Sequence, residues 1–354
     1  MLMTTEAFLF KKGLGVAQYI IVGDGLKFLP QISFYTGLRL VLEKNAIKYS
    51  FHQPVKSTKE NLKIHKALDL IERFLCTTLG KWSGFFLYTS WYKDTLLIGC
   101  AKGQSEPYFF KVFKQESYAQ KEQVHMEKLS SLYGRWFQIP QVIECSKSFF
   151  VLSFVNRCAR VKKQAACQLL ATAADNWKKK PAGGSASLVS LLEKFQDLTA
   201  HLNYAGFSKT KNNNIVETIH GQLATQWSEY PLYLTHGDMT PWNMYLTSSD
   251  KIALVDSERV GLRSIYTDLL HYHIQQKAMQ RFAPGSAVFF IHYLCRWTNI
   301  KQDEAKAYSI LYLLEELCQD AQNLINFNGQ QTLGRAFAQK LLWLNNIVKN
   351  SPSS

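Results

Sequence analysis

LTHGDMTPWNMYLTSSDKIALVDSE, residues 234–258, is the stretch of the chain that decides its fold. Three polar groups stand in it, separated by short apolar runs: His236-Gly237-Asp238, then Asn243, then Asp256-Ser257-Glu258. Any one of these residues alone is most simply a turn residue, because Asp and Asn are common in turns. Their regular spacing between apolar segments instead indicates a site.

The two apolar runs predict a β-hairpin. Residues 244–247 and 252–255 are strand-like, and residues 248–251 form a plausible turn. This register would pair position 247 with 252 and position 243 with 256, so we expect Asn243 beside Asp256. An amide and a carboxylate oxygen there suit Mg²⁺, which prefers hard oxygen ligands and takes others from water and phosphates. Glu258 would point to the same side if the strand continues, and could support the metal or the substrate.

Asp238 precedes Asn243 by five residues, the spacing of a kinase catalytic loop. In such a loop the Asp accepts the proton of the substrate hydroxyl, the Asn holds Mg²⁺, and a second metal-binding Asp follows later in the chain. Phosphoryl transfer asks the protein mainly for positioning, neutralisation of charge and a carboxylate near the nucleophile. The sequence therefore favours a phosphate-and-metal centre.

At these residues the chain resembles the aminoglycoside phosphotransferase and choline kinase-like group of small-molecule kinases. The pattern H-G-D-x-x-x-x-N, followed by a hydrophobic residue and D-x-E, stands here as HGDMTPWN and LVDSE. The resemblance implies that Asp238 is the catalytic base, that His236 shapes the catalytic loop, and that Asn243 and Asp256 bind the nucleotide through Mg²⁺. Glu258, placed by strand alternation, is a further candidate metal ligand. Ser257 departs from the Trp often found there. Asp268 matches the family's following Asp, which anchors the loop.

The resemblance also assigns roles upstream. FFKVF (109–113) is similar to the third strand of the small lobe, which makes Lys111 the residue that grips the α- and β-phosphates of ATP. Glu122 matches the helix glutamate that orients this lysine through an ion pair, although Glu116 and Glu127 compete for that role. FVLSFVNR (150–157) fits the hinge that meets the adenine. The phosphate-covering loop, expected between Lys93 and Leu96, has no glycine-rich signature.

The fold class implied is α+β: a bilobal protein-kinase-like fold with a small β-rich N-lobe and a larger helical C-lobe. Strand-like runs over 82–113, a helix over 117–134 and two further strands predict the order β-β-β-α-β-β. Residues 176–187 read as an exposed loop, a helix follows, and the last 85 residues read as largely helical. We expect an N-terminal extension of unknown role at 1–75, the N-lobe at 82–157 and the C-lobe at 158–350.

Composition narrows the partners. The formal net charge of +14 favours nucleotides, acidic or phosphorylated sugars, or an anionic surface, although a basic surface without a dedicated partner is equally compatible. The cofactors implied are ATP and Mg²⁺. The acceptor is expected to be a small-molecule hydroxyl, in a neutral, acidic or membrane-associated saccharide rather than a polycation. No nucleic-acid partner is expected, since the lysines do not form a recognisable binding module.

Seven scattered cysteines, with no C-x-x-C pair, predict neither a zinc site nor a disulfide framework and fit a reducing cytosol. The most apolar N-terminal run, residues 16–22, is far shorter than the roughly 18–20 residues of a membrane span. We therefore expect a cytoplasmic protein, with peripheral contact at a membrane left open.

Four alternative functions each match part of the sequence. A nucleotide-binding pseudokinase would regulate a partner, but all of the polar positions are intact. A protein kinase would carry HRD rather than HGD and an activation segment after Asp256. An aminoglycoside-modifying kinase fits the motif, but its polycationic acceptor is disfavoured by the net charge of +14. A nucleic-acid binder rests on charge alone. An ATP-dependent phosphotransferase acting on a hydroxyl is the reading favoured by the sequence.

Overall fold

The computed structural model divides the chain into two compact units, which are described separately: residues 1–160 with 245–258, and residues 161–244 with 259–354. The residues described are 17–22, 82–89, 94–101, 108–113, 116–145, 149–153, 157–179, 184–202, 209–247, 249–278, 288–326 and 331–349. Residues 57–75, whose spacing predicts a helix, and residues 32–43, which read as strand-like, lie outside the described residues. Residues 90–93, where the phosphate-covering loop is expected, also lie outside them, and the described strand that follows begins at Asp94.

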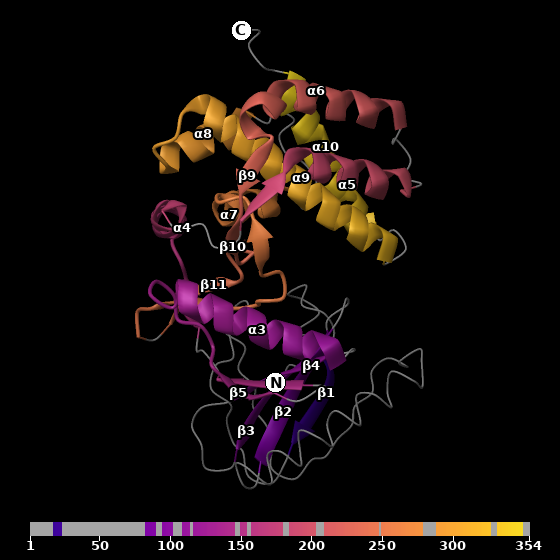
Figure 1. The fold of residues 1–354 in the computed structure, drawn as a ribbon. Helices are drawn as coiled ribbons and strands as arrows, with labels where there is room; N and C mark the ends of the chain where they lie inside the picture. The colour runs from indigo at the N-terminus through magenta and orange to yellow at the C-terminus, as the bar shows by residue number, and fades with distance from the viewer. Residues whose placement is uncertain are drawn as a thin grey trace, which may run out of the picture. The chain divides into compact units, whose positions relative to one another are not determined.

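Six described strands of the first unit form one antiparallel sheet in the order β1-β2-β3-β4-β6-β5. Helix α3 (Glu116–Tyr133) lies between β4 and β5 in the chain, so the predicted order β-β-β-α-β-β is confirmed (Figure 1). A strand from the N-terminal section, β1, extends this sheet by pairing with β2. The strands are β1 (Ala17–Val22), β2 (Trp82–Thr89), β3 (Asp94–Ala101), β4 (Tyr108–Phe113), β5 (Val142–Cys145) and β6 (Phe149–Ser153).

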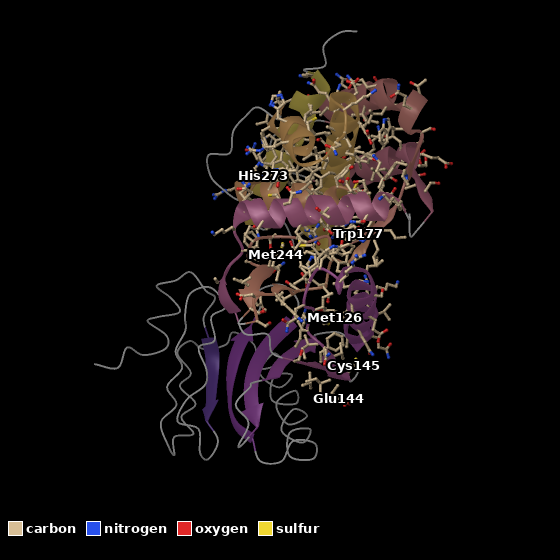
Figure 2. The ribbon with its side chains drawn as sticks, turned by 90° about the vertical axis from the view of Figure 1, so that its left-hand side faces the viewer. Met126, Glu144, Cys145, Trp177, Met244 and His273 are labelled. Atoms are coloured by element: carbon tan, nitrogen blue, oxygen red, sulfur yellow. The ribbon has the colours of Figure 1, made fainter. Side chains whose placement is uncertain are left out.

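Helix α3 buries one side in a small apolar core. Ala119 and Met126 of the helix share a buried cluster with Phe150 and Leu152 of β6 (Figure 2). From the sequence, Val124, Leu129 and Leu132 are expected to mark the apolar side of this helix. This is wrong at Val124, which is 45% exposed, because the buried apolar residues instead follow the spacing 119, 126, 129 and 133. Gly134 ends the helix as predicted: a Cβ there would lie 2.4 Å from the carbonyl oxygen of Ser130.

The predicted hairpin is present as β11 (Met244–Thr247) and β12 (Ile252–Leu254), in the sheet order β12-β11-β7, where β7 is Arg157–Arg160. Its turn is one residue shorter than predicted. The amide of Thr247 donates to the carbonyl of Lys251 at 2.8 Å, and Asp250 takes a left-handed φ of 55°. Asp250 tolerates that conformation because its short polar side chain can bond locally. Position 247 therefore pairs with 251 instead of 252, and the predicted register, with position 243 opposite 256, is wrong by one residue.

The second unit is largely helical, and the helices predicted in the last 85 residues are confirmed. The long helix α9 is its centre and packs against α5, α7, α8 and α10 (Figure 1). The buried residues of α9, mostly Leu, Ala and Tyr, lie on nearly every side of the helix. The helices are α4 (Lys163–Lys178), α5 (Leu188–Ala200), α6 (Lys209–Trp227), α7 (Thr267–Ala278), α8 (Val288–Trp297), α9 (Gln302–Asn326) and α10 (Gln331–Lys349).

Two short antiparallel sheets complete the described part of this unit. Strand β8 (Ser185–Ser187) pairs with β9 (Glu229–Pro231), and β10 (Tyr233–Thr235) pairs with β13 (Gly261–Arg263). The loop predicted at 176–187 is wrong at both ends, because α4 continues to Lys178 and residues 185–187 form β8. Ser187 then caps α5 by accepting from the amide of Ser190.

Candidate active site

The loop His236–Asn243 follows strand β10 directly, and helix α7 holds that loop in place. The Asp268 carboxylate, in the first turn of α7, accepts from the backbone amides of His236 and Gly237, each at 2.8 Å. Asp268 and His236 are both buried. The expectation that Asp268 anchors the loop is therefore confirmed, and buried His236 forms part of the loop's packing.

Gly237 is required by the backbone of this loop. Its φ is +74°, in the left-handed region that favours glycine. A Cβ at this position would lie 2.1 Å from Nη1 of Arg263 and 2.3 Å from the carbonyl oxygen of Arg259. The glycine of the H-G-D motif thus lets two elements approach the loop more closely than any side chain would allow.

The five-residue spacing brings Asp238 and Asn243 together. The side-chain amide nitrogen of Asn243 donates to Oδ2 of Asp238 at 2.9 Å and to its backbone carbonyl at 2.8 Å. Both bonds use the nitrogen, so the amide oxygen is the Asn243 atom suited to a cation. The Asp238 side chain is 18% exposed.

Two basic side chains, to which the sequence assigned no role, lie near the Asp238 carboxylate. Nε2 of His271 is 3.1 Å from Oδ1 of Asp238, and Nη1 of Arg259 is 3.9 Å from the same oxygen. Burial alone would raise the pKa of Asp238, but the His271 hydrogen bond and the Arg259 charge outweigh it and hold that pKa below its usual value. Asp238 is therefore ionised at neutral pH, as a general base must be.

The first unit contains a second group of predicted site residues. Nζ of Lys111, on β4, donates to both carboxylate oxygens of Glu122, on α3, at 2.9 and 2.8 Å. Each residue is only 6% exposed. The ion pair selects Glu122 over its competitors. Lys111 lies on an inner strand of the sheet, because it pairs with Leu96 of β3 and Phe150 of β6.

Asp256 belongs to this second group. Its Oδ1 is 3.6 Å from Nζ of Lys111, its side chain is 40% exposed, and its φ is +67°. A non-glycine residue at positive φ carries conformational strain, of the kind that clusters at functional sites. The strand argument for Glu258 does not hold, because β12 ends at Leu254 and the left-handed Asp256 interrupts the alternation. A metal role for Glu258 stays a prediction.

Ser257 contributes a contact that the sequence did not predict. Its hydroxyl donates to Oε1 of Glu122 at 3.3 Å, and its carbonyl is 3.3 Å from Nδ1 of His125 on α3. The D-x-E segment is thereby tied to the helix that carries Glu122. A tryptophan at this position could not make the hydroxyl contact, so the departure from the family pattern has a local use.

The structure thus places the predicted residues in two groups, Asp238 with Asn243 and His236 in the second unit, and Lys111 with Glu122 and Asp256 in the first. His271 and Arg259 were missed because only the fold brings them to Asp238. One signal was available: His271 follows Asp268 by three residues, and residues three apart share a helix face. Of the predicted hinge, β6 is described and residues 154–156 lie outside the described part.

Three further expectations concern the described residues only. No group of three His, Cys, Asp or Glu side chains there could hold a metal alone. A nucleotide-borne Mg²⁺ would not need such a group, since phosphates supply part of its shell. Among the described cysteines, Cys167, Cys295 and Cys318 are not in disulfide bonds. No described helix combines the length and apolarity needed to cross a membrane.

Comparison with known proteins identifies the fold. Neither a protein-family model nor a curated protein sequence matches this chain. Among solved structures, similar folds include a choline kinase from Streptococcus pneumoniae, at a TM-score of 0.54 and 12% identity over 79% of this chain and 99% of that one. A Plasmodium vivax ethanolamine kinase gives a TM-score of 0.51 at 11% identity, over 81% and 91% of the two chains.

A thermostable aminoglycoside phosphotransferase, solved with ADP and hygromycin B, gives a TM-score of 0.52 at 13% identity, over 80% of this chain and 99% of that one. The chain therefore has the α+β, kinase-like fold of the group that its motifs resemble. At these identities the likeness shows the fold.

Proposed function

We propose that this protein is an ATP-dependent phosphotransferase that moves the γ-phosphate to a hydroxyl of a small molecule. The proposal rests on the kinase-like fold together with one observation, the buried Lys111–Glu122 ion pair 3.6 Å from Asp256. Burying a charged pair gains little stability on its own, because desolvation offsets the attraction. A buried lysine on an inner strand, held by a helix glutamate next to an exposed aspartate at positive φ, is better explained by phosphate binding.

Asp238 is the proposed catalytic base. As the acceptor oxygen bonds to the γ-phosphorus, the bond from that phosphorus to the bridging oxygen of ADP breaks, and the hydroxyl proton passes to the Asp238 carboxylate. The lowered pKa of Asp238 keeps the carboxylate ionised before the reaction. Lys111 would neutralise charge on the α- and β-phosphates, with Glu122 fixing its direction.

The donor set fits a magnesium ion. The amide oxygen of Asn243 and the exposed carboxylate of Asp256 are hard oxygen ligands, and nucleotide phosphates supply others. These two residues would hold the ion, with Glu258 as a further ligand. When bound, Mg²⁺ neutralises phosphate charge and orients the γ-phosphate.

For the acceptor we propose a neutral or acidic sugar, or a saccharide carried at a membrane surface. The net charge of +14 disfavours a polycationic acceptor. The proteins with similar structures act, by their names, on choline, ethanolamine or aminoglycosides, which are cationic. The acceptor proposed here therefore rests on the charge of this chain and on no neighbour.

The test is a screen for ADP formation with ATP and Mg²⁺ over sugars, sugar phosphates, amino-alcohols and aminoglycosides, in parallel with a direct nucleotide-binding titration. We expect acceptor-dependent turnover that EDTA abolishes. ATP binding without turnover on any acceptor would support a pseudokinase instead. Strong turnover of aminoglycosides with none of sugars would overturn the proposed acceptor class and leave the phosphotransferase itself intact.

A further inference from the structure

A single turn of helix α7 holds the catalytic loop at two points. Asp268 binds the backbone of the loop at His236 and Gly237, and His271, three residues later, reaches the side chain of Asp238. The His271 side chain is fully buried. One helix face thus fixes both the path of the loop and the carboxylate that the loop presents.

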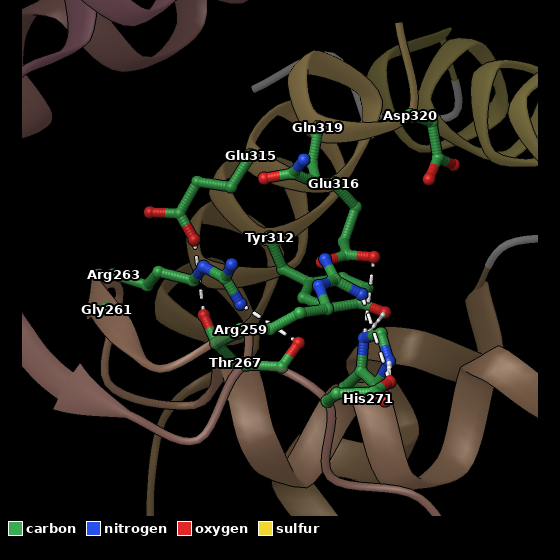
Figure 3. Close-up of polar contacts among 12 residues, drawn as sticks. Arg259, Gly261, Arg263, Thr267, His271, Tyr312, Glu315, Glu316, Gln319 and Asp320 are labelled. Atoms are coloured by element: carbon green, nitrogen blue, oxygen red, sulfur yellow. Dashed lines mark hydrogen bonds and ion pairs between the residues drawn. The ribbon is translucent and has the colours of Figure 1, made fainter. Parts of the chain in front are cut away.

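The far side of the His271 ring is equally constrained. Its Nδ1 lies 3.2 Å from the hydroxyl of Tyr312 and 3.5 Å from Oε2 of Glu316, both on α9 (Figure 3). A carboxylate only accepts hydrogen bonds, so Nε2 donates to Asp238, while Nδ1 faces the Tyr312 hydroxyl and the Glu316 carboxylate. The imidazole is therefore held from both ends, and its orientation is set by α9.

Glu316 is itself fixed within the protein. It is 1% exposed, and its two oxygens bind different cations, Arg259 at 2.6 Å and Lys340 at 2.9 Å. Arg259 also lies 3.9 Å from Asp238, farther away than His271. Arg259 is thus the alternative partner that the Asp238 carboxylate could turn to if the His271 bond were lost.

We propose that His271 is a positioning residue for the base Asp238, an inference that rests on the proposed function. His271 binds Oδ1 and Asn243 binds Oδ2, so two donors on different oxygens prevent the carboxylate from rotating. Tyr312 and Glu316 fix the ring that makes one of these bonds. Removing the imidazole lets the carboxylate rotate toward Arg259 and lose the direction in which it accepts the acceptor proton.

Two substitutions test this role kinetically. His271→Phe keeps a buried ring and removes the hydrogen-bond donor. In His271→Gln, the side-chain amide nitrogen can still donate to Asp238. We expect His271→Phe to lower kcat by about 10²-fold with the KM for ATP nearly unchanged, and His271→Gln to recover most of that loss. Tyr312→Phe, which removes only the support of the ring, should lower kcat less and in the same direction.

A merely structural role predicts another pattern, in which both His271 variants lower the unfolding midpoint while folded enzyme keeps the wild-type kcat. That result would overturn the inference and leave the phosphotransferase proposal standing.

A spectroscopic measurement decides the contact independently of turnover. In protein labelled with ¹⁵N-histidine, the Nε2–H signal of His271 should be protected from exchange and should shift in Asp238→Asn, but not in the control Glu258→Gln. A signal indifferent to Asp238→Asn would overturn the inference whether or not an acceptor is found.

Discussion

Lys340 offers the sharpest test of how the buried charges support this fold. It lies on α10 with no exposed surface, and its Nζ is 2.9 Å from Oε2 of Glu316 and 2.8 Å from Oδ2 of Asp320, both on α9. Lys340→Met keeps most of the side-chain volume and removes the charge. The variant therefore leaves two buried carboxylates without the cation that they share, and creates little cavity.

The expected cost is about 3–5 kcal/mol, because removing one partner of a buried ion pair leaves an uncompensated buried charge. A domain has a total stability of roughly 5–15 kcal/mol, so this loss is a large fraction of it. The double variant Lys340→Met/Asp320→Leu should recover part of the loss, since the Asp320 carboxylate is then absent and Glu316 still pairs with Arg259.

The loss should depend on pH with a defined sign. Burial alone would raise the pKa of Glu316, but Arg259 and Lys340 hold it well below its usual value. This pairing stabilises the wild type above the unfolded-state carboxyl pKa and is lost as pH falls through the lower folded-state pKa. Without Lys340 the folded-state pKa rises, so the difference between wild type and variant is largest near pH 7 and shrinks toward about pH 4.

The assay is urea unfolding at pH 7 and at lower pH, followed by far-UV circular dichroism. The matched control is Lys349→Met, at an exposed position of the same helix, which should change stability by less than about 0.5 kcal/mol. If Lys340→Met costs no more than this control, or if its cost grows as pH falls, the argument from buried charge is wrong.

Three further predictions concern the candidate site. Gly237→Ala should destabilise by more than the roughly 1–2 kcal/mol of a left-handed residue, because its Cβ also meets the Arg259 carbonyl, whereas Gly221→Ala, with open space in α6, should stabilise slightly in the same urea assay. Glu122→Gln should lower kcat/KM for ATP by about 10- to 100-fold, and exposed Glu127→Gln should leave it unchanged. Asp256→Asn should abolish magnesium-dependent turnover with an unchanged unfolding midpoint; residual activity near the wild-type level would remove Asp256 from the metal site.

The sequence was sufficient where local pattern and motif agree. Alternation and β-branched or aromatic content located β2, β3 and β4, and helical period located α3 and α9. The motif spacing predicted the contact between Asn243 and Asp238, because five residues of loop bring the two side chains together. The Lys111–Glu122 pair, eleven residues apart, needed the resemblance, since charge alone could not choose among three glutamates.

The remainder depended on long-range structure. His271 and Arg259 meet Asp238 through tertiary packing, and the local pattern offers only the three-residue spacing of His271 from Asp268, with no signal for Arg259. The hairpin register shifted because Asp250 adopts a left-handed turn that a strand count does not foresee. The loop predicted at 176–187 failed because β8 is made by pairing with β9, more than forty residues away, and the polar composition of that segment gave no sign of it.

The most direct measurement is the turnover of Asp238→Asn relative to wild type, with ATP, Mg²⁺ and the best acceptor from the screen, alongside nucleotide affinity. The account predicts that kcat falls by about 10²–10⁴-fold while ATP binds as before, because positioned proton transfer contributes that much. Turnover by Asp238→Asn at the wild-type rate would contradict it, since the carboxylate that the loop, Asn243 and His271 hold in place would then have no part in the reaction.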